Sequence, residues 1–493
     1  MNINSPMRLG DLLEGLAPVR QDVVLTGLTL DSRTVKPGDV FIALAGAREH
    51  GLRHAGTALA KGACAIVYDP QNAPVVQASL RDSVPAIAIN QLGHKLGLLG
   101  SRFYRRSSDK INVIGITGTN GKTSCSQFLG QMLDACGIIG TLGWGSFGQL
   151  HETQNTTPDA LTLQAMLAEF VREGKKTVAM EVSSHGLEQG RVAGIPFKGA
   201  VFTNISRDHL DYHGSMENYL AAKLTLLQTP GLLFAVVNLD DDYSTQILSA
   251  IPENVSVWGI SATGRTVLGG ETLQVAGISP ISDGTCFEVI WRDVRRRVHV
   301  PLYGDFNALN AAMVLVVMLA TGMELGPAVD KLVQLQAVPG RMECFGGADE
   351  PLIFVDYAHT PAALEQVLSG LRRHCTGKLT VVLGCGGNRD VGKRPQMGRI
   401  AEQWADHVII TDDNPRDEAS ADIIAAIRSG CRSDKITVIA DRKMAITTAL
   451  KQAGHRDCVL VAGKGHEHYQ EIRGVRMPFS DRDIVRQTLK AAS

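Results

Sequence analysis

Short apolar runs separated by polar turns recur along the whole chain, and several of them lead into segments whose apolar residues have helical spacing. The first 88 residues contain the runs VVLTGLTL, DVFIAL, ACAIVY and VPAIAI and one helical stretch, GLRHAGTALAKGA. Further along, INVIGIT, KTVAMEV, KGAVFTN and LLFAVVN each lead into a polar segment or a helix. Alternation of this kind predicts a mostly parallel sheet flanked by helices.

The pattern restarts after Val338-Pro339-Gly340, the best linker candidate. Five apolar runs follow, LIFVDYA, KLTVVLG, HVIITDD, KITVIAD and CVLVAGK, and each of the first four precedes an amphipathic helical stretch. At roughly 150 residues per domain, three domains are expected. We predict an α/β protein with a small α/β domain over residues 1–88, a central P-loop-type domain with a mostly parallel sheet over 89–338, and a Rossmann-like doubly wound domain over 339–493.

Charge and composition exclude some classes of partner. With 49 basic and 50 acidic residues the net charge is -1, so we expect neither nucleic acid nor an anionic membrane surface as a partner. The N-terminus, MNINSPMRLGDLLEGLAP, lacks the order of a secretory signal, and the longest apolar run, AAMVLVVMLA, is too short to span a bilayer. We therefore expect a cytoplasmic protein without membrane insertion. The nine cysteines lack zinc spacing and are interpreted as reduced core residues, Cys385 included.

The segment INVIGITGTNGKTS is typical of a phosphate-binding loop between a strand and a helix. Gly118 and Gly121 allow the backbone to approach phosphate oxygens, Lys122 adds a positive charge, and the hydroxyl of Thr123 can bind a magnesium ion. The strict pattern requires a glycine where Ile116 stands, so the loop is a variant. It predicts binding of a nucleoside triphosphate.

Two further strand ends carry groups that suit the same ligand. Glu181 ends the run KTVAMEV, while Asp208, His209 and His213 follow KGAVFTN. Carboxylate oxygens near a triphosphate favour magnesium. Lys223 lies on an otherwise apolar helical face, and its spacing alone indicates a structural lysine whose ammonium extends to solvent.

Four polar loops follow strands of the C-terminal domain, namely DYAHTP, GCGGNRDVGKR, DDNPRDE and GKGHEHY. Ligands of doubly wound sheets bind beyond the carboxyl ends of the strands. One such loop alone can be structural, since Asp-Asn-Pro commonly starts a helix. Together, the four loops predict a site for a zwitterionic or multiply charged ligand.

The strings GTNGKT, MEVSSHGLEQGRV, TNISRDHLDYHG, GDFNALNAA, VPGRME, DYAHTP, DDNPRDE and AGKGHE resemble the Mur ligase family of peptidoglycan synthesis over almost the whole chain. Within the family they are most similar to the ligase that acts third in the pathway. The resemblance implies an ATP- and Mg²⁺-dependent ligase. It would add meso-diaminopimelate to the D-glutamate of UDP-N-acetylmuramoyl-L-Ala-D-Glu through an acyl phosphate. We expect a monomer.

Residue roles follow from the same resemblance. The expected ATP-binding residues are Gly118, Thr119, Asn120, Gly121, Lys122, Thr123, Ser124, Asn310, Arg341 and Asp356. The expected catalytic residues are Lys122, Glu181, His209 and Lys223, and the expected metal ligands are Thr123, Glu181, His209 and Lys223. Lys223 would be carbamylated to N6-carboxylysine, which reverses its structural interpretation. Carbamylation needs a neutral amine, and burial lowers a lysine pKa from about 10.4.

The resemblance also implies two substrate sites. The expected nucleotide-sugar residues are Leu30, Ser32, Ala47, Arg48, Glu49, Asn155, Thr156, Thr157, Ser183, Gln189 and Arg191, with backbone contacts expected from residues 47–49. The expected diaminopimelate residues are Arg389, Asp413, Asn414, Pro415, Arg416, Gly463 and Glu467.

Arg416 decides the acceptor, because a guanidinium pairs with the carboxylate that diaminopimelate has and lysine lacks. Three alternatives stay open at this point. They are an L-lysine-adding Mur ligase, a ligase similar to folylpolyglutamate synthetase, and a non-catalytic nucleotide switch. The sequence indicates no general base.

Overall fold

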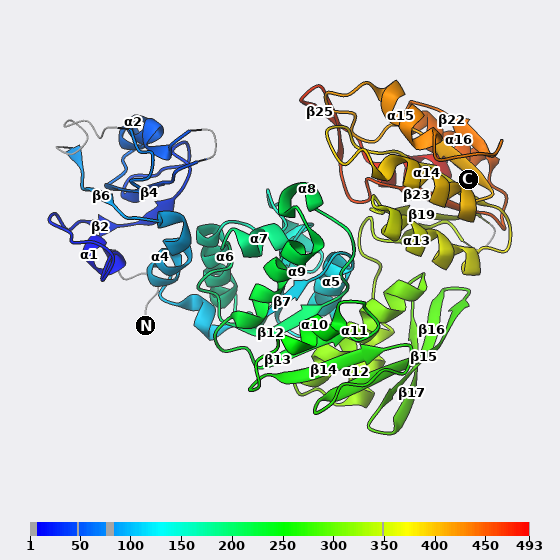
Figure 1. The fold of residues 1–493 in the computed structure, drawn as a ribbon, viewed down its shortest axis with the longest axis horizontal. Helices are drawn as coiled ribbons and strands as arrows, with labels where there is room; N and C mark the ends of the chain where they lie inside the picture. Colours follow the sequence, from blue (N-terminus) through cyan, green and yellow to red (C-terminus); the bar gives the residue numbers. More distant parts are fainter. Residues whose placement is uncertain (1–6, 47–48, 75–82, 348–349, 493) are drawn as a thin grey trace. The chain divides into compact units, whose positions relative to one another are not determined.

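The computed structural model describes residues 7–46, 49–74, 83–347 and 350–492 (Figure 1). The chain forms two compact units, each described by itself below. Unit 1 comprises Met1–Thr117, Asp134–Ala200 and Ala221–Leu233, and unit 2 comprises Gly118–Leu133, Val201–Leu220 and Phe234–Ser493. The predicted α/β class is confirmed, while the three domain boundaries stay a prediction.

Unit 1 begins with a small parallel sheet of order β3-β4-β5-β6. One face of β4 and β5 packs on α2, and the other face packs on α1, α4 and the start of α6. The predicted helix over GLRHAGTALAKGA is a 3-10 turn followed by α2, and the run VVLTGLTL is divided between two strands. The elements are β1 (Met7–Arg8), α1 (Leu9–Leu12), β2 (Val24–Leu25), β3 (Gly27–Thr29), β4 (Asp39–Ala43), η1 (Gly51–His54), α2 (Ala55–Ala60), β5 (Ala65–Tyr68), β6 (Ala86–Ala88), η2 (Leu92–Lys95), α4 (Leu96–Phe103) and η3 (Ser107–Lys110).

The second part of unit 1 carries parallel strands, with β11 paired to β7 on one side and to β8 on the other. An antiparallel extension through β9 and β10 follows β8. Strand β12 and helix α9 run across the boundary between the units. The elements are β7 (Asn112–Thr117), β8 (Cys136–Gly140), β9 (Gly143–Ser146), β10 (Gln149–His151), α6 (Ala160–Arg172), β11 (Thr177–Glu181), α7 (Ser184–Glu188), β12 (Phe197–Phe202), α9 (Met216–Leu224) and η4 (Thr225–Gln228).

The first part of unit 2 contains a meander that the alternation pattern does not predict. Strands β13, β14 and β15 are parallel, but β15, β16 and β17 are antiparallel neighbours. Helix α11, apolar on nearly all sides, is buried beside them. The elements are α5 (Lys122–Met132), α8 (Leu210–His213), β13 (Phe234–Asn238), α10 (Ser244–Ser249), β14 (Ser256–Ser261), β15 (Glu271–Ile281), β16 (Gly284–Trp291), β17 (Val294–Val300), α11 (Asp305–Ala320) and α12 (Leu325–Leu332).

The C-terminal part of unit 2 is doubly wound, as predicted. All five predicted strands form one parallel sheet, with β18 added antiparallel at one edge. Helices α13, α14 and α15 cover one face, and α16 and α17 cover the other. The elements are β18 (Glu343–Phe345), β19 (Leu352–Asp356), α13 (Pro361–His374), β20 (Leu379–Leu383), α14 (Lys393–Trp404), β21 (His407–Ile410), α15 (Ser420–Arg428), β22 (Ile436–Val438), α16 (Arg442–Gln452), β23 (Cys458–Ala462), β24 (Tyr469–Ile472), β25 (Val475–Pro478) and α17 (Asp481–Ala492).

Two expectations on the whole chain can be checked here. All nine cysteines lie in the described part of the chain and are free thiols, and six of them are buried. Among the described residues, no helix is both long enough and apolar enough to cross a bilayer.

Candidate active site

The predicted phosphate loop starts helix α5 at Lys122, as its sequence indicates. Gly121 immediately precedes the helix in a left-handed conformation with φ of 84°. The ammonium of Lys122 donates to the carbonyl oxygens of Gly118 and Thr119, at 2.9 and 2.7 Å. The loop is therefore curled around its own lysine, with the first turn of α5 providing backbone N–H groups for an anion.

A second segment of unit 2 holds this loop in place. Asn204, two residues after the end of β12, accepts from the backbone N–H groups of Thr119 and Asn120, and its Nδ2 donates to the carbonyl of Asn120. Thr203 Oγ1 also donates to that carbonyl, at 2.6 Å. No role was predicted for Asn204, although it belongs to the segment TNISRDHLDYHG that was singled out at a strand end.

Gly118→Ala is expected to lower kcat/KM for ATP by at least about 100-fold, because φ at this position is 140° and an added Cβ would lie 1.9 Å from Thr203 Oγ1. The matched control is Gly264→Ala, where φ is 85° but no atom lies within 4 Å of the added carbon. The control isolates the cost of the left-handed backbone. Equal activities of the two variants would contradict the steric argument.

Arg341 links the loop region to the C-terminal sheet within unit 2. Its Nη2 donates to Thr123 Oγ1 at 3.3 Å, and its guanidinium lies 4.3 Å from the ring centre of Tyr357. Its Nε is buried without a hydrogen-bond partner in the described structure. Both carboxylate oxygens of Asp356 accept from backbone N–H groups, at 2.7 Å, and burial raises the Asp356 pKa. Arg341 thus has donor capacity for an anionic ligand.

The predicted metal ligands of unit 1 are both buried. Glu181 is 0% exposed, and its two oxygens accept from the N–H and the hydroxyl of Thr141, at 2.9 and 3.0 Å. Lys223 is 1% exposed, with Nζ 3.4 Å from the hydroxyl of Thr117, the residue before the phosphate loop. The spacing-based interpretation of Lys223 as a lysine that reaches solvent is wrong, because its amine is buried with the rest of the side chain.

Several predicted nucleotide-sugar residues form one hydrogen-bonded cluster in unit 1. Thr157 donates to the Glu181 carbonyl and accepts from the N–H of Ser183, while Arg191 donates to Gln189 and to the Thr157 carbonyl. The hydroxyl of Thr156 lies 3.0 Å from that of Thr141.

The other predicted nucleotide-sugar residues take no part in the hydrogen bonds just described. Leu30 and Ser32 follow β3, Asn155 is exposed, and Glu49 contacts His54 at 3.0 Å. Ala47 and Arg48 lie outside the described residues.

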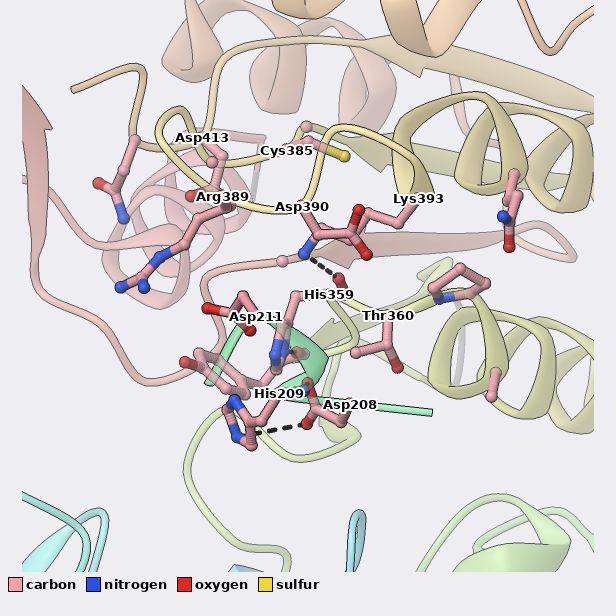
Figure 2. A pocket seen from close by; sticks show the side chains of 18 of the residues that line it. Asp208, His209, Asp211, His359, Thr360, Cys385, Arg389, Asp390, Lys393 and Asp413 are labelled. Atoms are coloured by element: carbon pink, nitrogen blue, oxygen red, sulfur yellow. Dashed lines mark hydrogen bonds and ion pairs between the residues drawn. The ribbon is translucent and has the colours of Figure 1, made fainter. Parts of the chain in front are cut away.

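A cavity of about 860 Å³ lies beyond the carboxyl ends of the C-terminal strands (Figure 2). All four polar loops singled out in the sequence contribute to its wall, together with residues 207–211. The predicted acceptor residues that line it are Arg389, Asp413, Asn414, Arg416, Gly463 and Glu467. Pro415 lies between two of them in sequence. The cavity combines cationic and anionic side chains, which suits a zwitterion.

Arg416 has an unusual backbone, with φ of 52°. Its N–H donates to the Glu471 carbonyl and its own carbonyl accepts from the N–H of Arg473, so the loop after β21 pairs with β24. Nη1 of Arg416 donates to the Gly387 carbonyl at 2.8 Å, and the Glu471 carboxylate lies 3.8 Å from its Nε. These contacts hold the guanidinium at the cavity wall.

Asp208, His209 and His359, labelled in Figure 2, also line the cavity. Burial acts to raise the Asp208 pKa, but the charges of His209, His359 and Lys122 outweigh it, and the pKa is lowered. Burial, with the charge of Lys393, lowers the His359 pKa. An acidic side chain and imidazole rings therefore face this part of the cavity. No role was predicted for His359 or Lys393, although both belong to the polar loops singled out in the sequence.

Cys385 lines the cavity but is 4% exposed, and burial raises its pKa to about 12. We expect iodoacetamide at pH 8 to leave Cys385 unlabelled in the folded protein and to label it after unfolding in urea, because the thiolate is the reactive form. Mass spectrometry of the peptides gives the readout. Rapid labelling of Cys385 in the folded protein would contradict its interpretation as a core thiol.

The chain is similar to known proteins over almost its whole length. Three family models match consecutive parts of the chain: the Mur ligase family catalytic domain over residues 24–104, the Mur ligase middle domain over 116–318, and the Mur ligase glutamate ligase domain over 340–465. The UDP-N-acetylmuramoyl-L-alanyl-D-glutamate 2,6-diaminopimelate ligase of Pseudomonas aeruginosa is 46% identical over 499 residues, covering 99% of each chain. The chain belongs to the Mur ligase family.

Other Mur ligases agree with this assignment. The ligase of the same name from Coxiella burnetii is 44% identical over 95% of this chain and 96% of its own. A solved structure with that name has a TM-score of 0.70, 36% identity and 99% coverage of both chains. MurF of Thermotoga maritima in complex with ADP has a TM-score of 0.67 at 20% identity, covering 94% of this chain and 98% of its own, and shares the fold. The predicted family is confirmed.

Proposed function

We propose that this Mur ligase joins meso-diaminopimelate to the D-glutamate carboxylate of UDP-N-acetylmuramoyl-L-Ala-D-Glu at the expense of ATP. The name of the full-length relatives supports the reaction. The observation on this chain that supports the reaction is the cavity, because Arg416 lines the cavity together with Asp413 and Glu467. Such a wall provides partners for both the carboxylate and the ammonium at the far end of the acceptor.

The proposed reaction begins when the γ-carboxylate of the D-glutamyl residue attacks the γ-phosphorus of ATP. ADP leaves and an acyl phosphate forms. The acceptor amine then attacks the acyl carbon, phosphate leaves, and the amine loses a proton as the amide forms. The phosphate loop and Lys122 supply N–H groups and a positive charge for the transferring phosphoryl group. Arg341, with its unpartnered Nε, would bind another phosphate oxygen.

Magnesium fits the donors present, and the proposed ligands are Thr123, Glu181, His209 and carbamylated Lys223. Among the described residues, no three His, Cys, Asp or Glu side chains form a metal-holding group by themselves. Phosphate oxygens of ATP would add to these ligands. A buried lysine next to a hydroxyl is a suitable site for carbamylation. Bound Mg²⁺ would neutralise phosphate charge.

The nucleotide-sugar substrate would bind to unit 1. The cluster of Thr156, Thr157, Ser183, Gln189 and Arg191 offers hydroxyl, amide and guanidinium groups for its pyrophosphate and sugar oxygens. Leu30 and Ser32 would contact the uridine part. We also propose that residues 1–88, 89–338 and 339–493 act as nucleotide-sugar, ATP and acceptor domains, and that the enzyme works as a cytoplasmic monomer.

Phosphate release tests the proposal. The purified protein is given ATP, Mg²⁺ and UDP-N-acetylmuramoyl-L-Ala-D-Glu with meso-diaminopimelate, with L-lysine, or with no amino acid. Release that depends on diaminopimelate is the expected result. Release with L-lysine alone would show that lysine is the acceptor, and the proposed ligase reaction would still stand. Equal release in all three arms would overturn the ligase reaction and favour a nucleotide switch. Activity on a folate substrate instead would indicate a folylpolyglutamate synthetase.

A further inference from the structure

Lys464 is a fully buried lysine behind the wall of the acceptor cavity. It follows Gly463 on the loop after β23, and its side chain is 0% exposed. Its Nζ donates to Asn414 Oδ1 at 3.0 Å and to Glu467 Oε2 at 2.8 Å. It also lies 5.5 Å from the ring centre of Tyr469. A buried ammonium is costly unless it is paired and hydrogen-bonded, so these contacts are a specific arrangement.

The two partners of Lys464 are joined to each other as well. Asn414 Nδ2 donates to Glu467 Oε2 at 2.9 Å, and Asn414 Oδ1 also accepts from the N–H of Glu471 at 2.9 Å. Because Asn414 Oδ1 accepts from both Lys464 and Glu471, the side-chain amide of Asn414 is held with its oxygen toward these donors. Lys464 therefore fixes the orientation of Asn414 and of Glu467, which both line the cavity.

The charge of Lys464 also changes the electrostatics of that wall. Arg389 and Arg416 face the cavity together with Asp413 and Glu467. Lys464 compensates the negative charge of Glu467, to which it is bound. Without it, the negative charge of Glu467 would stand uncompensated close to where an acceptor carboxylate binds. Diaminopimelate carries two carboxylates and lysine one, so the loss would penalise diaminopimelate more.

We propose that Lys464 is a positioning residue that sets the selectivity for an acceptor with a second carboxylate. It acts through Asn414 and Glu467 and does not itself line the cavity. The inference rests on the proposed ligase function and deepens it, because it concerns how the same cavity distinguishes two amine substrates.

The test is steady-state kinetics of Lys464→Met, which removes the charge and the donors at similar side-chain length. KM for meso-diaminopimelate should rise about 10-fold or more, and the ratio of kcat/KM for diaminopimelate to that for L-lysine should fall by a similar factor. KM values for ATP and for the nucleotide-sugar substrate should stay within about twofold. Lys464→Arg, which keeps the charge, should retain more of the selectivity than Lys464→Gln. If Lys464→Met does not fold, the comparison of Lys464→Arg with Lys464→Gln still tests the inference.

Val459→Ala is the matched control for destabilisation, since it shortens a buried side chain of β23, the strand that precedes Lys464, and leaves a small cavity. It should lower the melting temperature without changing the acceptor ratio. A double-mutant cycle with Glu467→Gln should be non-additive in KM for diaminopimelate, because both changes act on one contact.

An unchanged acceptor ratio in Lys464→Met, or strict additivity in the cycle, would overturn the inference. A wild-type protein without acceptor-dependent phosphate release would instead overturn the proposed function.

Discussion

Arg416→Ala is expected to raise KM for meso-diaminopimelate about 100-fold while KM for ATP stays within about twofold. The guanidinium lines the cavity and is held there by the Gly387 carbonyl and by the neighbouring Glu471. Removing one partner of a desolvated charge pair costs about 2–5 kcal/mol, and every 1.4 kcal/mol corresponds to about tenfold in affinity. Steady-state kinetics with each substrate varied in turn measures the effect.

Arg476→Ala is the matched control for this change. Arg476 lies 3.7 Å from the same Glu471 carboxylate, but its side chain is 64% exposed and is not part of the cavity wall. Its removal should change KM for diaminopimelate by no more than about twofold, as for an exposed ion pair. If the two variants gave the same KM, Arg416 would not be the group that binds the acceptor carboxylate.

Asp481→Asn is expected to destabilise the C-terminal part of unit 2 by about 3–5 kcal/mol, because it leaves the charge of Arg442 buried without its partner. Both side chains are 0% exposed, and Nε and Nη2 of Arg442 donate to the two oxygens of Asp481, at 2.8 and 2.7 Å. Arg442 also donates to the carbonyls of Asp412 and Ala462, near the ends of two strands that bear cavity loops. Urea unfolding followed by circular dichroism measures the loss.

Asp483→Asn serves as the control on the same helix, α17. Asp483 is 61% exposed and lies 3.4 Å from Arg486, so its pair contributes about 0–1 kcal/mol. The double variant Arg442→Met with Asp481→Leu should recover much of the stability, since no unpaired charge remains. Indistinguishable urea midpoints for Asp481→Asn and Asp483→Asn would show that the buried pair does not stabilise this sheet.

Much of the fold could be predicted from the chain because periodicity is strong where strands are buried on both sides. All five C-terminal runs are strands, and each of the first four is followed by a helix. The β15 to β17 meander was not predicted. Its second turn is Arg292-Asp293, where both residues have positive φ, a conformation that Asn-Gly or Asp-Gly usually signals. Tertiary context, and not local preference, fixes that hairpin.

Some residues of the candidate site could likewise be predicted from the sequence, and others could not. Ligands of doubly wound sheets bind beyond the carboxyl ends of the strands, and the four loops that follow these ends do line one cavity. Arg389, Asp413 and Arg416 could therefore be placed at this cavity from the sequence. The role of Lys464 could not be predicted, because it depends on a hydrogen bond to Asn414, fifty positions earlier in the chain. The burial of Lys223 was likewise hidden, since an apolar face with one lysine has the same pattern whether or not its amine reaches water.

The pairing of the loop after β21 with β24 has a consequence for how acceptor use evolves in such enzymes. Arg416 receives its backbone geometry from Glu471 and Arg473, more than fifty positions later in the chain. These contacts join main-chain atoms, so they persist when the side chain at position 416 is exchanged. A lineage can therefore change its acceptor by substitution at position 416 and inherit the shape of the loop unaltered, whereas an insertion or deletion in either segment would disturb that shape.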